Sequence, residues 1–242
     1  MTKERVYFLD WLRGAAVIGM ILHHSLFAVE MVSYFFGKPV EFAILKTWAF
    51  WILQEIFVGL FLLISGICTA FSKSVLRRGV IVAGAALLIT LVTGLILPAF
   101  GMSGLEIWFG ILHLFGASML LYGLFTYRKK WVPIATALVL FLVFLITVSF
   151  VELDFSLWVR AILGFPFEGF ASADYYPILP YFLVFLAGTF LGPLVRERRL
   201  PSSLYGLRVK PLEWIGRHSL WIYIVHQPII FGVVALIYYI SA

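Results

Sequence analysis

Runs of apolar residues as long as a lipid bilayer is thick constrain this chain more than any other feature. A helix needs about 20 mostly apolar residues to cross the hydrocarbon core of a bilayer. Seven stretches of the sequence meet that length, and short connections bearing charges, glycine or proline separate them. The stretches are residues 9–33, 47–71, 79–99, 106–126, 131–151, 176–195 and 213–239. The sequence therefore predicts an all-α, polytopic membrane protein with a bundle of about seven transmembrane helices.

The composition excludes most other classes of protein. Apolar residues make up 63% of the chain and charged residues 12%, whereas a soluble domain averages roughly 45–50% and 25%. Such an excess excludes a disordered chain and a nucleic-acid-binding module. Cys68 is the single cysteine, so the sequence offers neither an internal disulfide nor a cysteine-based metal site, and we expect no metal. No linker or internal repeat divides the sequence, which predicts one domain over residues 1–242.

The distribution of lysine and arginine predicts the orientation of the chain in the membrane. Cytoplasmic loops carry an excess of these residues. With a cytoplasmic N-terminus, 15 of the 18 Lys and Arg residues fall on the cytoplasmic side, and Lys38, Lys46 and Arg160 fall on the other. We therefore expect a cytoplasmic N-terminus and an outer C-terminus. The first stretch is too long for a signal peptide, so we expect it to remain as a transmembrane helix.

The longest outer connection, residues 152–175, is not an ordinary polar loop. It carries many aromatic and aliphatic side chains among a few charges. Such a segment lies in the membrane interface as an amphipathic helix, or it forms a lid over a cavity that opens outward. The sequence leaves both alternatives open.

Four titratable residues lie inside the expected spans at a similar depth. They are His24, Glu55, His113 and His226, on four different helices, and counting the helix rise places each in the outer half of the bilayer. Ionisable groups in a membrane usually face a cavity or a partner, so we predict a shared polar cavity. Each of them is also compatible with a structural hydrogen bond between helices. His23 is rotated about 100° from His24, so we expect only one of the two to face the cavity and treat His23 as secondary.

A second polar group is expected at the cytoplasmic end of the first helix. Asp10 and Arg13 stand three residues apart on one helical face, which favours an internal ion pair. The alternative is an inward-facing anion site formed by Arg13 with Arg5, Arg77 and Arg78. Guanidinium groups match phosphate oxygens well.

Five blocks of sequence carry a further signal. They are LDWLRG at 9–14 with His24 after it, FLLISG at 61–66, FGILH at 109–113, DYYPILPY at 174–181, and WIGRHSL with IVHQP at 214–228. Together and in this order, the blocks resemble the heparan-α-glucosaminide N-acetyltransferase catalytic-domain family, within the wider class of transmembrane acyltransferases. The resemblance covers essentially the whole chain.

The resemblance implies a transferase that takes an acyl group, usually acetyl, from cytoplasmic coenzyme A. The acceptor would be a sugar amine or hydroxyl on the other side of the membrane. In this picture His24 acts as general base or transient acyl carrier, and Glu55 orients it as a carboxylate does in a triad. His113 binds the acceptor or polarises the thioester carbonyl.

The same picture assigns the binding residues. The phosphates of acetyl-CoA cannot enter hydrocarbon at low cost, so we expect them at the cytoplasmic mouth. The residues assigned to the coenzyme are Arg5, Asp10, Arg13, Arg77 and Arg78. Those assigned to the acceptor are Asp174, His226 and Gln227. Nucleic acid is not an expected partner, and small residues in the second span would permit a homodimer without requiring one.

One position departs from the family pattern. The animal lysosomal members carry asparagine where His24 stands, so the resemblance is nearer to the short bacterial members and implies a bacterial-type plasma membrane. The acceptor cannot be carried over from the family. The alternative to an enzyme is a non-enzymatic membrane protein. It would be either a haem-b electron carrier, whose pair of axial ligands would come from among His24, His113 and His226, or a small-molecule transporter.

Overall fold

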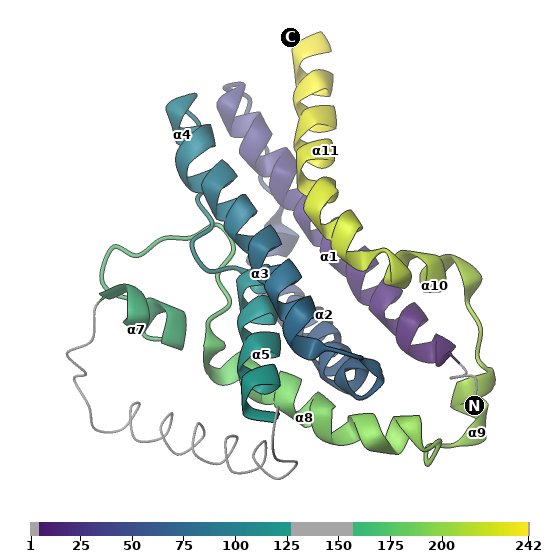
Figure 1. The fold of residues 1–242 in the computed structure, drawn as a ribbon. Coiled ribbons are helices and arrows are strands. Elements are labelled where there is room, and N and C mark those ends of the chain that lie inside the picture. Colours follow the sequence, from purple (N-terminus) through teal and green to yellow (C-terminus); the bar gives the residue numbers. More distant parts are fainter. Residues whose placement is uncertain (1–4, 127–156, 242) are drawn as a thin grey trace. The chain divides into compact units, whose positions relative to one another are not determined.

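The computed structural model describes residues 5–126 and 157–241, and the regular structure in these ranges is helical apart from an isolated bridge between Phe109 and Tyr175 (Figure 1). Five helical segments there are long and apolar enough to cross a membrane. They extend over Tyr7–Phe35 (α1), Trp48–Phe71, Val75–Ala99, Ile178–Arg196 (α8) and Ser219–Ile240 (α11). The all-α fold class predicted from the sequence is confirmed.

Two of these segments change helix type along their length. The segment Trp48–Phe71 consists of α2 (Trp48–Ile67) and a 3-10 helix at Cys68–Phe71. The segment Val75–Ala99 consists of α3 (Val75–Leu91), a π-helix at Val92–Ile96 and α4 (Leu97–Ala99). The shorter elements are α5 (Ile111–Thr126), α7 (Leu157–Leu163), α9 (Ser202–Gly206), α10 (Lys210–Arg217) and a 3-10 helix at Ala43–Lys46.

The predicted helices at 9–33, 47–71, 79–99 and 176–195 are confirmed, and two other boundaries were wrong. The helix expected over 106–126 begins only at Ile111, because the backbone before it bonds another segment. The carbonyl of Glu106 accepts from the N–H of Ala173 over 2.8 Å, and the carbonyl of Phe109 accepts from the N–H of Tyr176 over 3.1 Å. The stretch 131–151 lies outside the described residues. The count of seven spans and the orientation stay predictions.

The last expected helix, over 213–239, is two helices. α10 and α11 meet at His218, whose backbone is non-helical (φ −101°, ψ 12°). The N–H of His218 still donates to carbonyls of α10, and its own carbonyl accepts from Ile222 in α11. The break separates a short helix with polar ends from the apolar helix that is long enough to span.

The described chain divides into two compact units, one formed by residues up to Ile64 together with those from Arg198 onward, the other by Ser65–Glu197. We describe each unit by itself, and the single domain expected from the sequence stays a prediction.

The first unit depends on close contact between α1 and α10. A Cβ added at Gly14 would overlap the carbonyl oxygen of Leu212, and one added at Gly216 would overlap the carbonyl oxygen of Asp10. Both glycines belong to sequence blocks singled out above, LDWLRG and WIGRHSL. Only glycine lets the two backbones approach this closely. Phe8 and Leu9 are buried beside this contact.

The second unit is built from α3, α5 and α8. Gly116 of α5 lies against the backbone of Ala83 in α3, and a Cβ at Gly66 would overlap the carbonyl oxygen of Phe185 in α8. The ring of Phe185 is fully buried. Gly66 therefore serves close packing, as the small residues of FLLISG suggest.

The expected outer segment 152–175 is described from residue 157 onward. It holds the seven-residue helix α7 and a cluster of aromatic rings in edge-to-face contact, formed by Trp158, Phe167, Phe170 and Tyr175. These contacts are compatible with a lid and with an interfacial anchor, so both alternatives remain open.

Replacing Gly216 by alanine should destabilise the first unit, because the new methyl group has to displace the Asp10 carbonyl. Overpacking of this kind costs roughly 1–3 kcal/mol, and thermal unfolding of the purified protein in detergent measures it. Gly232→Ala in α11 is the matched control, since a Cβ there meets nothing within 4 Å and alanine favours helix. An unchanged melting temperature for Gly216→Ala would contradict this account of the α1–α10 contact.

Candidate functional site

A pair of histidines joins the first and last membrane-length helices. His24 of α1 and His226 of α11 are 202 positions apart in sequence, and the Nδ1 atom of His24 lies 2.7 Å from the Nε2 atom of His226. The two rings are nearly parallel, with 5.0 Å between their centroids. His226 is 5% exposed, and its Nδ1 atom lies 2.6 Å from the carbonyl oxygen of Tyr223. Two of the four titratable residues expected in one polar layer are therefore in direct contact.

The side chain of His23 has different neighbours from that of His24, as the rotation of about 100° between successive helical residues predicts. Its ring stacks on Phe50 at 5.4 Å between centroids, and its side chain hydrogen-bonds Gln54 of α2. The ring of His23 touches His24 edge-on. His24 is thus the histidine that bonds His226.

Glu55 does not hold His24 in the way expected from the sequence. In a triad, the carboxylate bonds the Nδ1 atom of the catalytic histidine. Here the Nδ1 atom of His24 bonds His226 instead. Glu55 is half-buried on α2 in the same unit, and its participation in catalysis stays a prediction.

His113, in the second unit, has both ring nitrogens engaged. Its Nδ1 atom accepts from the N–H of Gly110 over 3.1 Å, and its Nε2 atom lies 2.9 Å from Thr90 Oγ1. The Thr90 hydroxyl in turn donates to the carbonyl of Ile107. These bonds tie the start of α5 to α3, which is a structural role. The catalytic role expected for His113 stays a prediction.

Asp174 also has a structural partner. Its Oδ2 atom accepts from the N–H of Ile111, the first residue of α5, over 2.9 Å. A Cβ at Gly110 would overlap this carboxylate, so the glycine of FGILH makes room for the aspartate of DYYPILPY. A carboxylate at a helix N-terminus pairs with free N–H groups and with the positive end of the helix dipole. Asp174 therefore caps α5.

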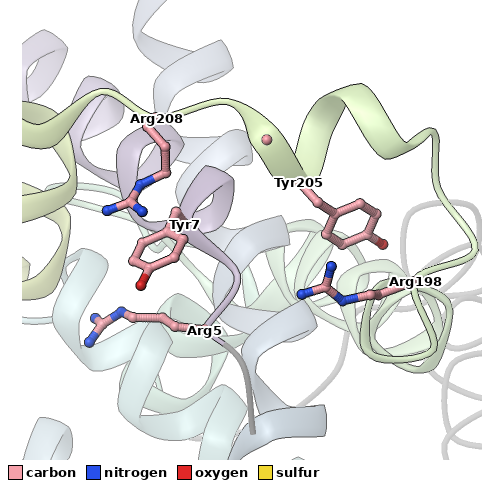
Figure 2. Close-up of a pocket in the computed structure, with 6 residues that line it drawn as sticks. Arg5, Tyr7, Arg198, Tyr205 and Arg208 are labelled. Atoms are coloured by element: carbon pink, nitrogen blue, oxygen red, sulfur yellow. The ribbon is translucent and has the colours of Figure 1, made fainter.

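A pocket lined by arginine and tyrosine lies at the other end of the first unit. It has a volume of about 390 Å³, and its lining residues are Arg5, Tyr7, Arg198, Tyr205, Gly206 and Arg208. Figure 2 shows the Arg208 guanidinium over the ring of Tyr7 and the Arg198 guanidinium beside Tyr205, at 3.4 and 5.2 Å from the ring centroids. Five of the six residues lie outside the membrane-length helices, and Tyr7 is the first residue of α1.

Two of the pocket arginines are held by carboxylates. Arg208 makes a two-pronged ion pair with the buried carboxylate of Glu213, over 2.8 and 3.1 Å. This guanidinium lowers the pKa of Glu213. Arg5 Nε lies 2.6 Å from Asp10 Oδ2. These pairs fix the direction of the guanidinium groups without using all of their N–H donors.

The anion site expected from the sequence is only partly brought together. Arg5 lies in the pocket and Asp10 orients it, whereas the guanidinium of Arg13 lies 6.0 Å from the ring of Phe61. Arg77 and Arg78 are exposed in the first turn of α3, in the second unit, so their part in an anion site stays a prediction. Sequence reasoning missed Arg198, Arg208 and the two tyrosines. The arginines had been counted only toward the positive charge of the cytoplasmic side.

One polar atom near the histidine pair lacks a partner. The Oε1 atom of Gln227, next to His226, is buried without a hydrogen bond. A buried carbonyl oxygen of this kind normally accepts from a donor. Within the described part of the chain, no group of three or more His, Cys, Asp or Glu side chains could hold a metal ion.

Comparison with known families decides what kind of protein carries these features. A family model described as heparan-alpha-glucosaminide N-acetyltransferase, catalytic, matches residues 5–228. The chain belongs to this family. It is thus an integral membrane member of a family of acetyltransferases, and the resemblance drawn from the five blocks is confirmed. No curated protein and no solved structure matches the chain significantly. The family favours an enzyme over the electron carrier and the transporter.

Asp174→Ala should destabilise the second unit, because it removes the cap of α5 and leaves the N–H of Ile111 without its acceptor. Loss of an N-cap costs about 0.5–2 kcal/mol, and thermal unfolding in detergent measures it. Asp174→Asn keeps an oxygen acceptor and should recover most of the loss. If the alanine variant melts as the parent protein does but no longer binds acceptor, the capping role is wrong and the acceptor-binding role expected from the sequence is favoured.

Proposed function

We propose that this protein transfers an acetyl group from cytoplasmic acetyl-CoA to a sugar amine or hydroxyl on the outer side of a bacterial-type plasma membrane. The observation that carries the proposal is the His24–His226 pair, whose two members lie near opposite ends of the matched residues 5–228. Histidine accepts and releases a proton near neutral pH, and acyl transfer to an amine or hydroxyl needs a group that does so.

His24 is the base in this proposal. It takes the proton from the acceptor N–H or O–H as the acceptor oxygen or nitrogen attacks the thioester carbonyl carbon. The C–S bond then breaks, and the proton on His24 passes to the departing thiolate of coenzyme A. In the variant with an acyl-enzyme, the His24 ring nitrogen attacks the carbonyl carbon first, and the C–S bond breaks to release the thiolate of coenzyme A. The acceptor then attacks the acetyl group, the bond from that group to His24 breaks, and the acceptor's proton passes through His24 to the thiolate. Both routes need the same unprotonated nitrogen on His24.

The arginine–tyrosine pocket suits the phosphates of the donor. Guanidinium forks bind phosphate oxygens in a two-pronged manner, and three of them line one pocket of about 390 Å³. His24 lies 14 residues beyond Asp10 on α1, a rise of about 21 Å. An extended pantetheine arm has a comparable length, so phosphates near Arg5 and a thioester near His24 fit one donor molecule.

Gln227 is our candidate for holding the acceptor. Its buried Oε1 atom has no partner in the described structure, and a sugar hydroxyl or amine would supply the missing donor. The carboxylate of Asp174 is engaged with the N–H of Ile111, which makes Asp174 a weaker candidate than the sequence indicated. The identity of the sugar and a homodimer are not needed for the mechanism.

His24→Ala should reduce acetyl transfer at least about 100-fold, the low end of what a general base contributes. The measurement follows label from acetyl-CoA into acceptors in native membranes that contain the variant in place of the parent protein. His218→Ala is the control, because His218 is exposed and bonds only its own helix carbonyl at Trp214 among the interactions described. Undiminished transfer by His24→Ala would overturn the proposed function.

Arg198→Ala should weaken donor binding and spare the chemical step. We expect KM for acetyl-CoA to rise about tenfold, the scale of one charge-assisted hydrogen bond, with kcat nearly unchanged. Added salt should weaken binding by the parent protein in the same direction, because it screens exposed charges. Arg198 is preferred over Arg208 because removal of Arg208 would take away the guanidinium partner of the buried Glu213 carboxylate.

Lys210→Ala is the matched control for Arg198→Ala. Lys210 is exposed, lies two residues beyond Arg208 and does not line the pocket, and its removal changes the net charge equally. Equal effects of the two substitutions would show that overall charge attracts the donor and would contradict a specific pocket.

A further inference from the structure

We propose that His226 is a positioning residue, which fixes the tautomer of His24 so that the Nε2 atom of His24 carries the free lone pair. This inference rests on the proposed function for the use of that lone pair, but the tautomer itself is a property of the resting protein. It replaces the acceptor-binding role that the sequence suggested for His226.

The backbone carbonyl of Tyr223 determines which ring nitrogen of His226 carries the hydrogen. A carbonyl oxygen only accepts hydrogen bonds, so the Nδ1 atom of His226, 2.6 Å away, has to carry a hydrogen. Tyr223 precedes His226 by three residues on the same helix, and the helix therefore holds this geometry without help from another element. The ring of His226 is oriented by its own backbone.

The position of the ring hydrogen on His24 follows from its position on His226. A buried imidazole costs less free energy when it is neutral, and a neutral ring carries one N–H. With its hydrogen on Nδ1, His226 presents a lone pair at Nε2. The Nδ1 atom of His24, 2.7 Å from that lone pair, must then be the donor. The hydrogen of a neutral His24 is thereby placed on Nδ1, and its Nε2 atom is left unprotonated.

This arrangement holds the tautomer of the catalytic histidine, as the carboxylate of a triad does, without a buried charge. In the serine hydrolases a carboxylate holds the catalytic histidine in the required tautomer. An ionised carboxylate inside a membrane is costly, whereas a second imidazole is neutral at rest. When His24 gains a proton at Nε2, the resulting positive charge is stabilised through Nδ1–H by His226 and, beyond it, by the Tyr223 carbonyl. Both nitrogens of His226 are occupied, so it acts through His24.

The test reads the tautomer and the kinetics separately. Nuclear magnetic resonance of 13C,15N-histidine in the full chain in nanodiscs distinguishes Nδ1–H from Nε2–H rings, and His24→Ala identifies the His24 signals among the five histidines. We expect His24 in the parent protein to be the Nδ1–H tautomer. In His226→Leu we expect a shift toward Nε2–H and a fall in kcat of about 100-fold, with KM for acetyl-CoA unchanged.

His226→Gln is the conservative variant. Its amide oxygen can accept from His24 Nδ1–H, so it should restore the tautomer and recover at least about tenfold of the lost kcat, which is within the range of a positioning hydrogen bond. His218→Gln is the matched control. His218 also bonds a carbonyl of its own helix, 2.9 Å from Trp214 O, but it is exposed, and its replacement should change neither measurement.

Two results would overturn the inference. One is an Nε2–H tautomer of His24 in the parent protein, which needs no variant to fold. The other is a fully retained Nδ1–H tautomer in His226→Leu. Failure of the proposed function looks different: His24→Ala would keep its transfer activity while the parent protein still shows the Nδ1–H tautomer.

Discussion

The close contact of two backbones at Gly14 and Gly216 is the constraint on which the histidine pair depends. Each glycine lies against a carbonyl of the other helix, where a methyl group would overlap it. His24 stands ten residues after Gly14, and His226 stands ten residues after Gly216. The path from Gly14 to His24 is one unbroken helix with a rise of about 15 Å, whereas the path from Gly216 to His226 passes the non-helical backbone at His218. The change of direction at His218 lets α11 bring His226 within 2.7 Å of His24.

Charge is distributed along the first unit according to what each region can stabilise. The ion pairs Arg5–Asp10 and Arg208–Glu213 both lie at the end where the pocket opens, and water can solvate the parts of them that are exposed. The polar contact between α1 and α11 at His24 consists of two imidazoles and a backbone carbonyl, which carry no charge in the tautomers proposed above. A charge at membrane depth costs several kcal/mol unless it is paired. The same unit thus offers arginine to an anion at one end and a neutral proton acceptor further along.

The sequence predicted the parts of this structure that depend on local pattern. Apolar length gives the membrane helices, and equal depth in the bilayer points to His24 and His226. The start of α5 was missed because residues 106–110 pair with a segment more than 60 positions away, which no local pattern reveals. The structural bonds of Asp174 and His113 could not be predicted for a similar reason, since the sequence does not show which partner a polar side chain has, and their functional roles stay predictions. Arg198 lines the pocket from the connection between α8 and α9, and a count of charges does not predict the path of that connection.

The unbroken length of α1 connects the two polar ends of the unit. α1 runs as one α-helix over Tyr7–Phe35, so the rise of about 21 Å between Asp10 and His24 is fixed by helix geometry and not by a flexible loop. A donor anchored by its phosphates beside Asp10 has to bring its reactive carbon across that distance through a long, thin and mostly neutral arm, because bulk and charge are costly between packed helices. Pantetheine meets each of these requirements. A small acyl phosphate anchored in the same pocket would leave its carbonyl far short of His24, so the length of α1 favours the coenzyme A thioester proposed above over such a donor.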